Sequence, residues 1–256
     1  MKSGIRVVFT LLAVLSVGDM SMRADELVEV REVDTFTSSG KTRQLEGWLS
    51  SDENFSKLYS IGQEGNNFFL KAAVKAEGVI IAKEFSYTLK EFPILSWKWR
   101  VQTLPKGGDE RYQHSGDSAA GVYIIFPSLF KPEKLKNSWG LKVPVPDSMK
   151  PECIKYVWSS TLPRGTVTES PYSGKTRIVV LESGNSSQPQ WITEEVNAYE
   201  DYKKLFQKEP EEVRAVGILT DADDTSSEAA ADYDDIFVKK TTEHQTKGMP
   251  EGKKEL

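Results

Sequence analysis

The sequence contains very little cysteine and histidine, and this excludes several kinds of chemistry. Cys153 is the only cysteine, so an intramolecular disulfide or a multi-cysteine zinc or iron–sulfur site is excluded. The two histidines, His114 and His244, have no partner at the spacing of a nucleophile motif, so a serine or cysteine triad is not indicated. We expect His114 to be a solvated loop residue and Cys153 a small, half-buried one.

An excess of positive charge is also missing. The 256 residues include 33 Lys and Arg against 38 Asp and Glu, which gives a formal net charge of −5. Nothing in this balance would attract nucleic acid, so we expect no nucleic-acid partner. A hydrophobic fraction of 38% with six tryptophans nevertheless predicts a folded body rather than a disordered chain.

Long apolar runs are absent after the first twenty residues. Residues 7–17 (VVFTLLAVLSV) follow Lys2 and Arg6 and precede a polar stretch, which is the layout of a secretory signal peptide over residues 1–24. A bilayer span needs about 20 apolar residues, so we expect no membrane span after signal cleavage. Export without disulfides predicts a periplasmic or secreted bacterial protein.

The remaining chain divides into one domain and a tail. Residues 25–238 predict a single domain, interrupted by a long proline-rich loop at 127–153. Residues 239–256 (KKTTEHQTKGMPEGKKEL) contain almost no apolar side chains, so we predict a disordered tail there.

The hydrophobic period of the domain is that of β-strands. Residues 95–102 (LSWKWRVQ) alternate apolar and polar side chains without a break, as a half-buried strand does. Residues 191–207 differ, and their apolar spacing and early acids predict one helix. We therefore expect a mainly β fold, an antiparallel β-sandwich of jelly-roll type with one helix late in the chain. The other predicted strands are 67–74, 78–85, 121–126, 154–159, 176–182, 213–220 and 235–238.

Carboxylates are concentrated near the ends of the last two predicted strands. Three interpretations of these carboxylates remain open. They form an acidic turn without a metal, a Ca²⁺ site, or a catalytic carboxylate pair that acts across a sugar. Asp117 could belong to such a pair. The other candidate acids for the pair are Asp221, Asp223 and Asp224.

Trp97 and Trp99 share one face of the strand 95–102, where they are either core residues or a platform for stacking sugars, with Trp158 beside them. Lys98 and Arg100 lie on the opposite face. They form either an ordinary solvated surface or a cationic groove for an acidic glycan or a phosphate.

Several blocks resemble a known family. Residues 95–101 (LSWKWRV), 116–126 (GDSAAGVYIIF) and 218–225 (ILTDADDT) are similar to signature blocks of exported bacterial proteins grouped as the domain of unknown function DUF3047. The resemblance covers about residues 28–238 and implies a secreted β-sandwich without an assigned activity.

The first and last strands also resemble those of galactose-binding-like jelly-roll carbohydrate modules, on residues 33–36 (VDTF), 47–48 (GW) and 233–237 (YDDIF). In such modules acids of these two strands hold a structural Ca²⁺. The resemblance implies that the metal ligands here come from Glu32, Asp34, Asp234 and Asp235.

The leading hypothesis is an exported, non-catalytic protein that binds a carbohydrate or cell-envelope glycan. Two alternatives remain: a glycan-cleaving enzyme using a carboxylate pair, and an envelope scaffold without a small ligand. The predicted ligand-binding residues are Trp97, Lys98, Trp99, Arg100, Asp117, Trp158, Asp221, Asp223 and Asp224.

Overall fold

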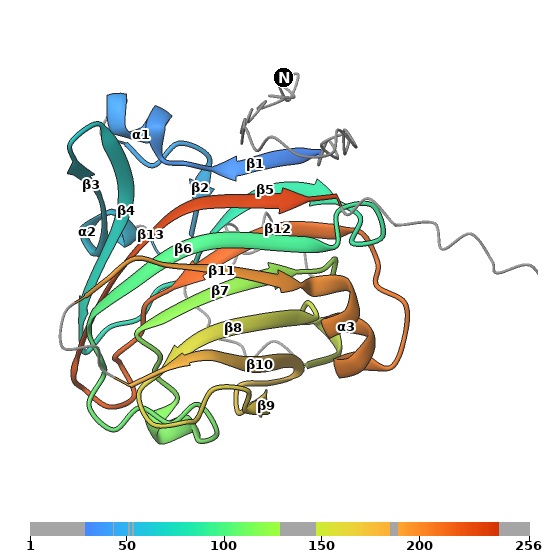
Figure 1. The fold of residues 1–256 in the computed structure, drawn as a ribbon. Coiled ribbons are helices and arrows are strands. Elements are labelled where there is room, and N and C mark those ends of the chain that lie inside the picture. Colours follow the sequence, from blue (N-terminus) through green and yellow to red (C-terminus); the bar gives the residue numbers. More distant parts are fainter. Residues whose placement is uncertain are drawn as a thin grey trace, which may run out of the picture.

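A computed structural model describes residues 29–240, except 43, 51, 53, 129–146 and 185–188. The predicted signal peptide, all but the first two residues of the predicted tail and most of the predicted loop 127–153 lie outside the described residues. Two β-sheets pack against each other, with the strands of each layer running roughly alongside those of the other (Figure 1). The predicted jelly-roll-like β-sandwich is confirmed in its class, and its sheets are almost wholly antiparallel.

One sheet has the strand order β11-β6-β13-β4-β3, with β1 also paired to β13. We call this sheet A. Its strands are β1 (Val30–Asp34), β3 (Tyr59–Glu64), β4 (Asn67–Lys75), β6 (Ile94–Thr103), β11 (Ile192–Asn197) and β13 (Glu228–Lys239).

The second sheet, sheet B, has the order β2-β5-β12-β7-β8-β10-β9. Its one parallel pair is β8 with β10. The strands are β2 (Trp48–Leu49), β5 (Ile81–Tyr87), β7 (Ala120–Ile125), β8 (Cys153–Ser159), β9 (Val167–Ser170), β10 (Ser173–Ser183) and β12 (Val213–Leu219). The short helices are α1 (Thr37–Thr42), α2 (Phe55–Leu58), α3 (Ala198–Phe206) and the 3-10 turns η1 (Gln113–Ser115) and η3 (Asp147–Met149).

The core lies between the sheets and is rich in aromatic side chains. Leu95, Trp97 and Trp99 of β6 are fully buried because they share the inward face that their alternation predicted. From sheet B, Tyr156 and Trp158 of β8 meet them, with ring centroids 5.6 Å apart for Trp97 and Tyr156 and 5.9 Å apart for Trp99 and Trp158.

The helix predicted over 191–207 is wrong in its first half. Residues Ile192–Asn197 form strand β11, which pairs with β6 along its whole length. Alternating burial of this segment shows that edge pairing with β6 outweighs its helical pattern. The helix begins after Asn197, whose side chain accepts a hydrogen bond from Glu200 N at 3.0 Å.

The two ends of sheet B differ in what covers them. At the C-terminal end of β7, Phe126 packs against Tyr202 of α3 with ring centroids 4.6 Å apart. At the opposite end, the connection from β6 to β7 carries η1 and returns the chain to Ala120 (Figure 1). Asp117 and Ser118 lie in that connection, and Asp221 follows β12, the neighbour of β7. This end of sheet B therefore brings the acidic loops together.

Candidate functional site

Three aspartates meet at the end of sheet B that is opposite to α3. Asp117, Asp221 and Asp223 each place a carboxylate oxygen within 4.8 Å of the others, and this is the only such group of three among the described residues. Asp221 and Asp223 follow β12, while Asp117 precedes β7, and these strands are hydrogen-bonded neighbours. Sheet pairing thus brings together side chains that are more than a hundred residues apart in the sequence.

Asp117 organises the neighbouring loop and is fully buried. Its Oδ1 accepts a hydrogen bond from Asp224 N at 3.2 Å, and its Oδ2 accepts from Thr225 N at 2.8 Å and from the Thr225 hydroxyl. Both oxygens accept hydrogen bonds from the loop, and the contact of Asp117 with a ligand stays a prediction. Asp117 acts as a positioning residue for the loop that carries Asp223.

Asp221 occupies a half-buried position that only a glycine neighbour permits. Gly78 pairs with it through an isolated bridge, and a Cβ at position 78 would lie 1.7 Å from Asp221 Oδ1. That oxygen has no hydrogen-bond partner among the described residues. Burial raises the pKa of Asp221 to about 7, and the charges of Asp223 and Asp117 add to the rise.

A lysine is buried beneath these carboxylates. Lys155, at the middle of β8, is 5% exposed, and its Nζ donates a hydrogen bond to Ser118 Oγ at 2.9 Å. Burial lowers the pKa of Lys155, while the charge of Asp221 opposes this most strongly, followed by that of Glu110. The site therefore holds a buried cation with carboxylates above it.

Glu110 is a second buried charged residue near Lys155, and the sequence analysis did not select it. Its side chain is fully buried; Oε2 accepts a hydrogen bond from Ser159 Oγ at 2.6 Å, and Oε1 has no partner among the described residues. Burial raises the pKa of its carboxyl group. No sequence signal pointed to Glu110 or Lys155, because each is one charged residue in an otherwise ordinary loop or strand.

Two exposed tyrosines lie in the loops around this site, and one of them, Tyr172, contacts a carboxylate. Among the described Phe, Tyr and Trp side chains, Tyr112 and Tyr172 are the most exposed, at 50% and 45%. The Tyr172 hydroxyl lies within hydrogen-bond distance of Gln113 O, at 2.9 Å, and of the Asp224 carboxylate. Tyr112 stacks on His114 in the same loop, which places the exposed His114 where we expected it.

The sequence analysis did not select either tyrosine. Each stands singly among polar residues, in RYQH and SPYSG, and a lone tyrosine in a loop has no periodicity to mark it. The only sequence feature that could have indicated an exposed ring was the position of each tyrosine within a turn-forming segment.

The predicted aromatic platform is wrong. Trp97 and Trp99 are fully buried between the sheets, and Trp158 is 4% exposed with its Nε1 donating to Gly184 O at 2.9 Å. A sugar ring cannot reach these faces, because the packing of the two sheets covers them. The alternative that these residues form the core is the correct one.

The predicted cationic groove is also wrong. Lys98 Nζ lies 2.7 Å from Asp235, and Arg100 is bound to Asp232 at 2.7 Å and to Glu64 at 2.5 Å. The Arg100 guanidinium also lies over the neighbouring rings of Phe69 and Trp191. These acids neutralise the outer face of sheet A at both cations, and neither lies in the acidic loop cluster.

The four acids implied as metal ligands are not brought into one group. Asp34 accepts hydrogen bonds from Trp48 Nε1 at 2.8 Å and from Lys83 Nζ at 2.6 Å, inside the sandwich. Asp234 accepts from Asn67, and Asp235 pairs with Lys98. Asp34 and Asp234 are therefore engaged by protein donors, and Glu32 is hydrogen-bonded to Thr35 instead of to a shared centre.

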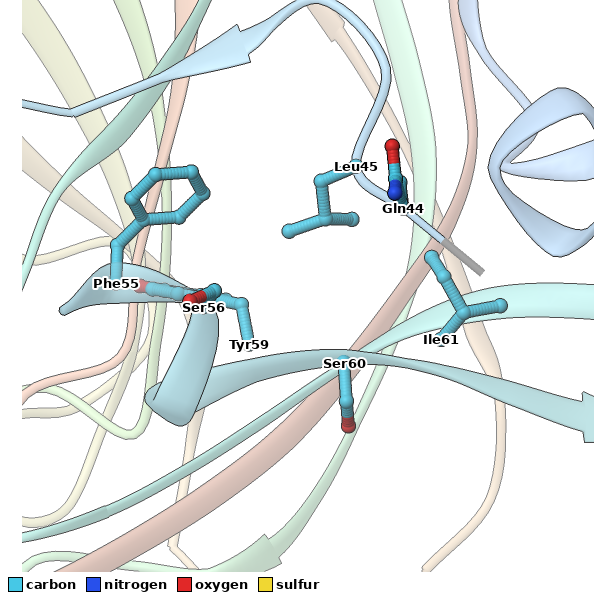
Figure 2. A pocket seen from close by; sticks show the side chains of 7 residues that line it. All are labelled: Gln44, Leu45, Phe55, Ser56, Tyr59, Ser60 and Ile61. Carbon is cyan, nitrogen blue, oxygen red and sulfur yellow. The ribbon is translucent and has the colours of Figure 1, made fainter. Parts of the chain in front are cut away.

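A hollow of about 460 Å³ lies elsewhere, between α2, the approach to β2 and the edge strand β3. Figure 2 shows Phe55, Leu45 and Ile61 around it, with the Ser60 side chain turned away. The residues that line it include no charged side chain, and its apolar members pack against the main core. It offers space but no group suited to acid–base or metal chemistry.

A family comparison identifies where the chain belongs. The model of the family described as "Protein of unknown function (DUF3047)" matches residues 46–237. The chain belongs to DUF3047. This DUF3047 chain places its carboxylate cluster, Lys155 and both exposed tyrosines inside the matched region. No curated protein matches it.

Solved structures similar to this DUF3047 protein include carbohydrate-binding modules and a glycoside hydrolase. TmCBM27, described for specific mannan recognition, is 14% identical with a TM-score of 0.39, over 84% of this chain and 99% of that one. CBM27-1 of Caldicellulosiruptor saccharolyticus, in complex with mannohexaose, is 11% identical with a TM-score of 0.36, over 82% and 96%. Endoglucanase 3 of Trichoderma harzianum, from family GH12, is 7% identical with a TM-score of 0.35, over 84% and 94%.

The helices of this DUF3047 protein were also compared with the requirements for crossing a bilayer. None of those in the described part of the chain has the length and hydropathy that a membrane span needs.

Proposed function

We propose that this DUF3047 protein is an exported, non-catalytic protein that binds a glycan at the acidic loop end of sheet B. The observation that carries the proposal is the position of Tyr172, one of the two most exposed aromatic side chains among the described residues, whose hydroxyl meets Asp224 in the loop of Asp221 and Asp223; the other, Tyr112, precedes Gln113, whose carbonyl also accepts from Tyr172. Aromatic faces stack on sugar rings and carboxylates accept hydrogen bonds from sugar hydroxyls, so the two kinds of group complement a saccharide.

The rigidity of the site supports binding. Three segments that are distant in sequence are tied together by Asp117, by the Tyr172 hydroxyl and by the hydrogen bond from Asp221 N to Ser118 O at 3.0 Å. A site whose groups are already held in place loses less conformational entropy when a ligand binds. Export is proposed from the N-terminal pattern of Lys2, Arg6 and the apolar run 7–17.

A glycan array probed with the intact protein tests the proposal. We expect saturable binding to a restricted set of oligosaccharides, and about ten-fold weaker binding after Tyr112→Ala or Tyr172→Ala, because each removes an exposed ring. Glu195→Gln is the matched surface control, since Glu195 pairs with Lys239 on sheet A. An array without any saturable signal would reject glycan binding. N-terminal sequencing of the protein recovered from the bacterial periplasm tests export, and a start near residue 25 is the expected result.

One observation favours glycan cleavage as a second candidate function. Asp221 and Asp223 place carboxylate oxygens within 4.8 Å of each other, and burial, together with the charge of Asp223, raises the pKa of Asp221 to about 7. A carboxylic acid that keeps its proton near pH 7 beside a second carboxyl group has the property required of a general acid. The oligosaccharides retained on the array would be incubated with the protein and analysed for new reducing ends. Release that is abolished in Asp221→Asn, with binding retained, would establish an enzyme.

A further inference from the structure

The connection between β6 and β7, residues 104–119, is held against the segment that follows β8 by polar contacts. Thr161 Oγ1 donates a hydrogen bond to Gly108 O at 2.7 Å. Residues 111–114 of the connection are exposed, whereas Glu110, directly before them, is fully buried. An exposed turn is thus joined directly to a charged residue inside the protein.

The buried carboxyl group of Glu110 has one hydrogen bond and one oxygen without a partner. Ser159 Oγ donates to Glu110 Oε2 at 2.6 Å and accepts from Leu162 N at 3.1 Å, so the single hydroxyl proton of Ser159 is given to Glu110. Glu110 Oε1 has no partner among the described residues. A buried carboxylate needs donors at both oxygens, so this environment suits the neutral carboxyl group better than the charged one.

Burial is the main influence on the ionisation of Glu110, and it raises the pKa of this carboxyl group. The Ser159 hydroxyl and the ammonium of Lys155, both on β8, favour ionisation, and the charge of Asp109 in the same connection opposes it. Lys155 does not bond directly to Glu110, because its Nζ donates to Ser118 Oγ at 2.9 Å. The neutral form of Glu110 is therefore more favoured here than in a glutamate surrounded by water.

We propose that Glu110 makes the docking of the β6–β7 connection pH-sensitive: the connection stays docked while this carboxyl group is neutral and opens more readily once the group has released its proton to solvent. The docked state binds the proton more tightly than the open state. Docking is therefore strongest in acid and weakens as the pH rises above the range in which a glutamate usually ionises. The exposed turn that carries Tyr112 moves with the connection.

Hydrogen exchange of the intact protein, followed by NMR from about pH 4.5 to about pH 8, tests this proposal. The amides of Asp109 and Ser115 report opening, since they donate to Ser115 O at 2.6 Å and to Tyr112 O at 3.2 Å. Each exchange rate is divided by the rate of an unstructured peptide at the same pH, which removes the chemical effect of pH on exchange. We expect the protection of both amides to decrease several-fold over this range, because opening becomes more favourable as Glu110 ionises.

Variants identify the titrating group. Glu110→Gln keeps an acceptor for the Ser159 hydroxyl and cannot ionise, so its protection should stay constant over the range. Asp221→Asn removes the nearby carboxyl group whose pKa is raised to about 7, and it should retain the decrease seen in the wild type. Glu195→Gln, which removes an exposed charge on sheet A, is the surface control and should behave like the wild type.

Carboxyl-carbon NMR of the wild-type protein gives the ionisation midpoint of Glu110 without any substitution. This midpoint should coincide with the pH at which protection decreases. Protection that does not depend on pH, or that decreases equally in Glu110→Gln, would overturn the proposal. A decrease that disappears in Asp221→Asn would assign the effect to Asp221 and overturn it as well.

The pH-sensitive docking goes beyond the proposed function, and only its effect on sugar binding rests on that function. Titration with an oligosaccharide retained on the array should show the affinity of Glu110→Gln, relative to the wild type, increasing several-fold as the pH rises, since the wild type opens and the variant does not. Comparing the two proteins at each pH cancels the ionisation of the other carboxyl groups. A blank array would reject glycan binding and leave the exchange result in place, whereas pH-independent exchange would overturn the docking proposal alone.

Discussion

Gly78 lies against the carboxylate of Asp221, so closely that a Cβ at position 78 would be 1.7 Å from Asp221 Oδ1. Real Cβ atoms do not approach other atoms to this distance, so any side chain at position 78 must displace Asp221 or the local backbone. The conformation of the carboxylate therefore depends on a residue in the connection to β5, which is distant from it in sequence.

Gly78→Ala is expected to weaken glycan binding and to destabilise the protein by about 1–3 kcal/mol, because overpacking forces side chains and backbone to shift. Urea unfolding and titration with the preferred sugar measure the two effects. In Asp221→Ala the clashing carboxylate is absent, so adding Gly78→Ala to it should cost much less stability. Additive costs in this double-mutant cycle would show that the two residues act independently.

The raised pKa of Asp221 makes stability depend on pH in a defined direction. The unfolded carboxyl ionises near pH 4 and the folded one near pH 7, so the folded state binds more protons between these values. Stability contributed by protonated Asp221 is therefore lost as the pH rises from about 4 to about 7. Asp221→Asn lacks this loss, so its stability relative to wild type should increase over that range, as measured by urea unfolding at stepped pH. A constant difference between the two proteins would contradict the assignment.

Lys155 lowers the proton affinity of Asp221, because a positive charge favours the ionised carboxylate. Lys155→Met keeps a long apolar stem and removes the charge, so the pKa of Asp221 should rise above 7. Carboxyl-carbon NMR of Asp221 across a pH titration measures this shift. Lys71→Met, which changes a lysine on β4 of the other sheet, is the control and should leave the titration of Asp221 unchanged.

Trp97 is a core residue, and the size of its contribution can be tested. Trp97→Ala is expected to cost about 3–5 kcal/mol of unfolding free energy, since it leaves a large cavity beside Trp99 and Tyr156. Trp97→Phe retains an aromatic ring and should cost less. If folded protein with either substitution loses sugar affinity while its stability is unchanged, the burial assigned to Trp97 is wrong.

The regular alternation of the sequence was enough to predict the sandwich. Residues 95–102 predicted both the strand β6 and its buried face, because alternate side chains of a strand lie on the same face and the apolar set must face the core. The same reasoning underestimated β13, of which only residues 235–238 were predicted, since its earlier part is rich in alanine and aspartate. Pairing with β4 and β6 extends that segment despite its low strand propensity.

The candidate site was predicted only in part. Asp221, Asp223 and Asp224 were selected because several carboxylates follow one strand within a few residues. Lys155, Glu110 and Tyr172 were not, because what brings them to the cluster is the order of strands in sheet B, which local patterns do not specify. The two tryptophans of β6 were left open between core and platform, and only packing decides between these.

The position of the last two strands has a consequence for biosynthesis. β12 lies between β5 and β7 in sheet B, and β13 lies between β4 and β6 in sheet A. Until residues 213–239 have left the ribosome, each sheet lacks a central strand and its neighbours have no partner on that side. Native pairing of both sheets therefore completes only after almost the whole domain has been synthesised.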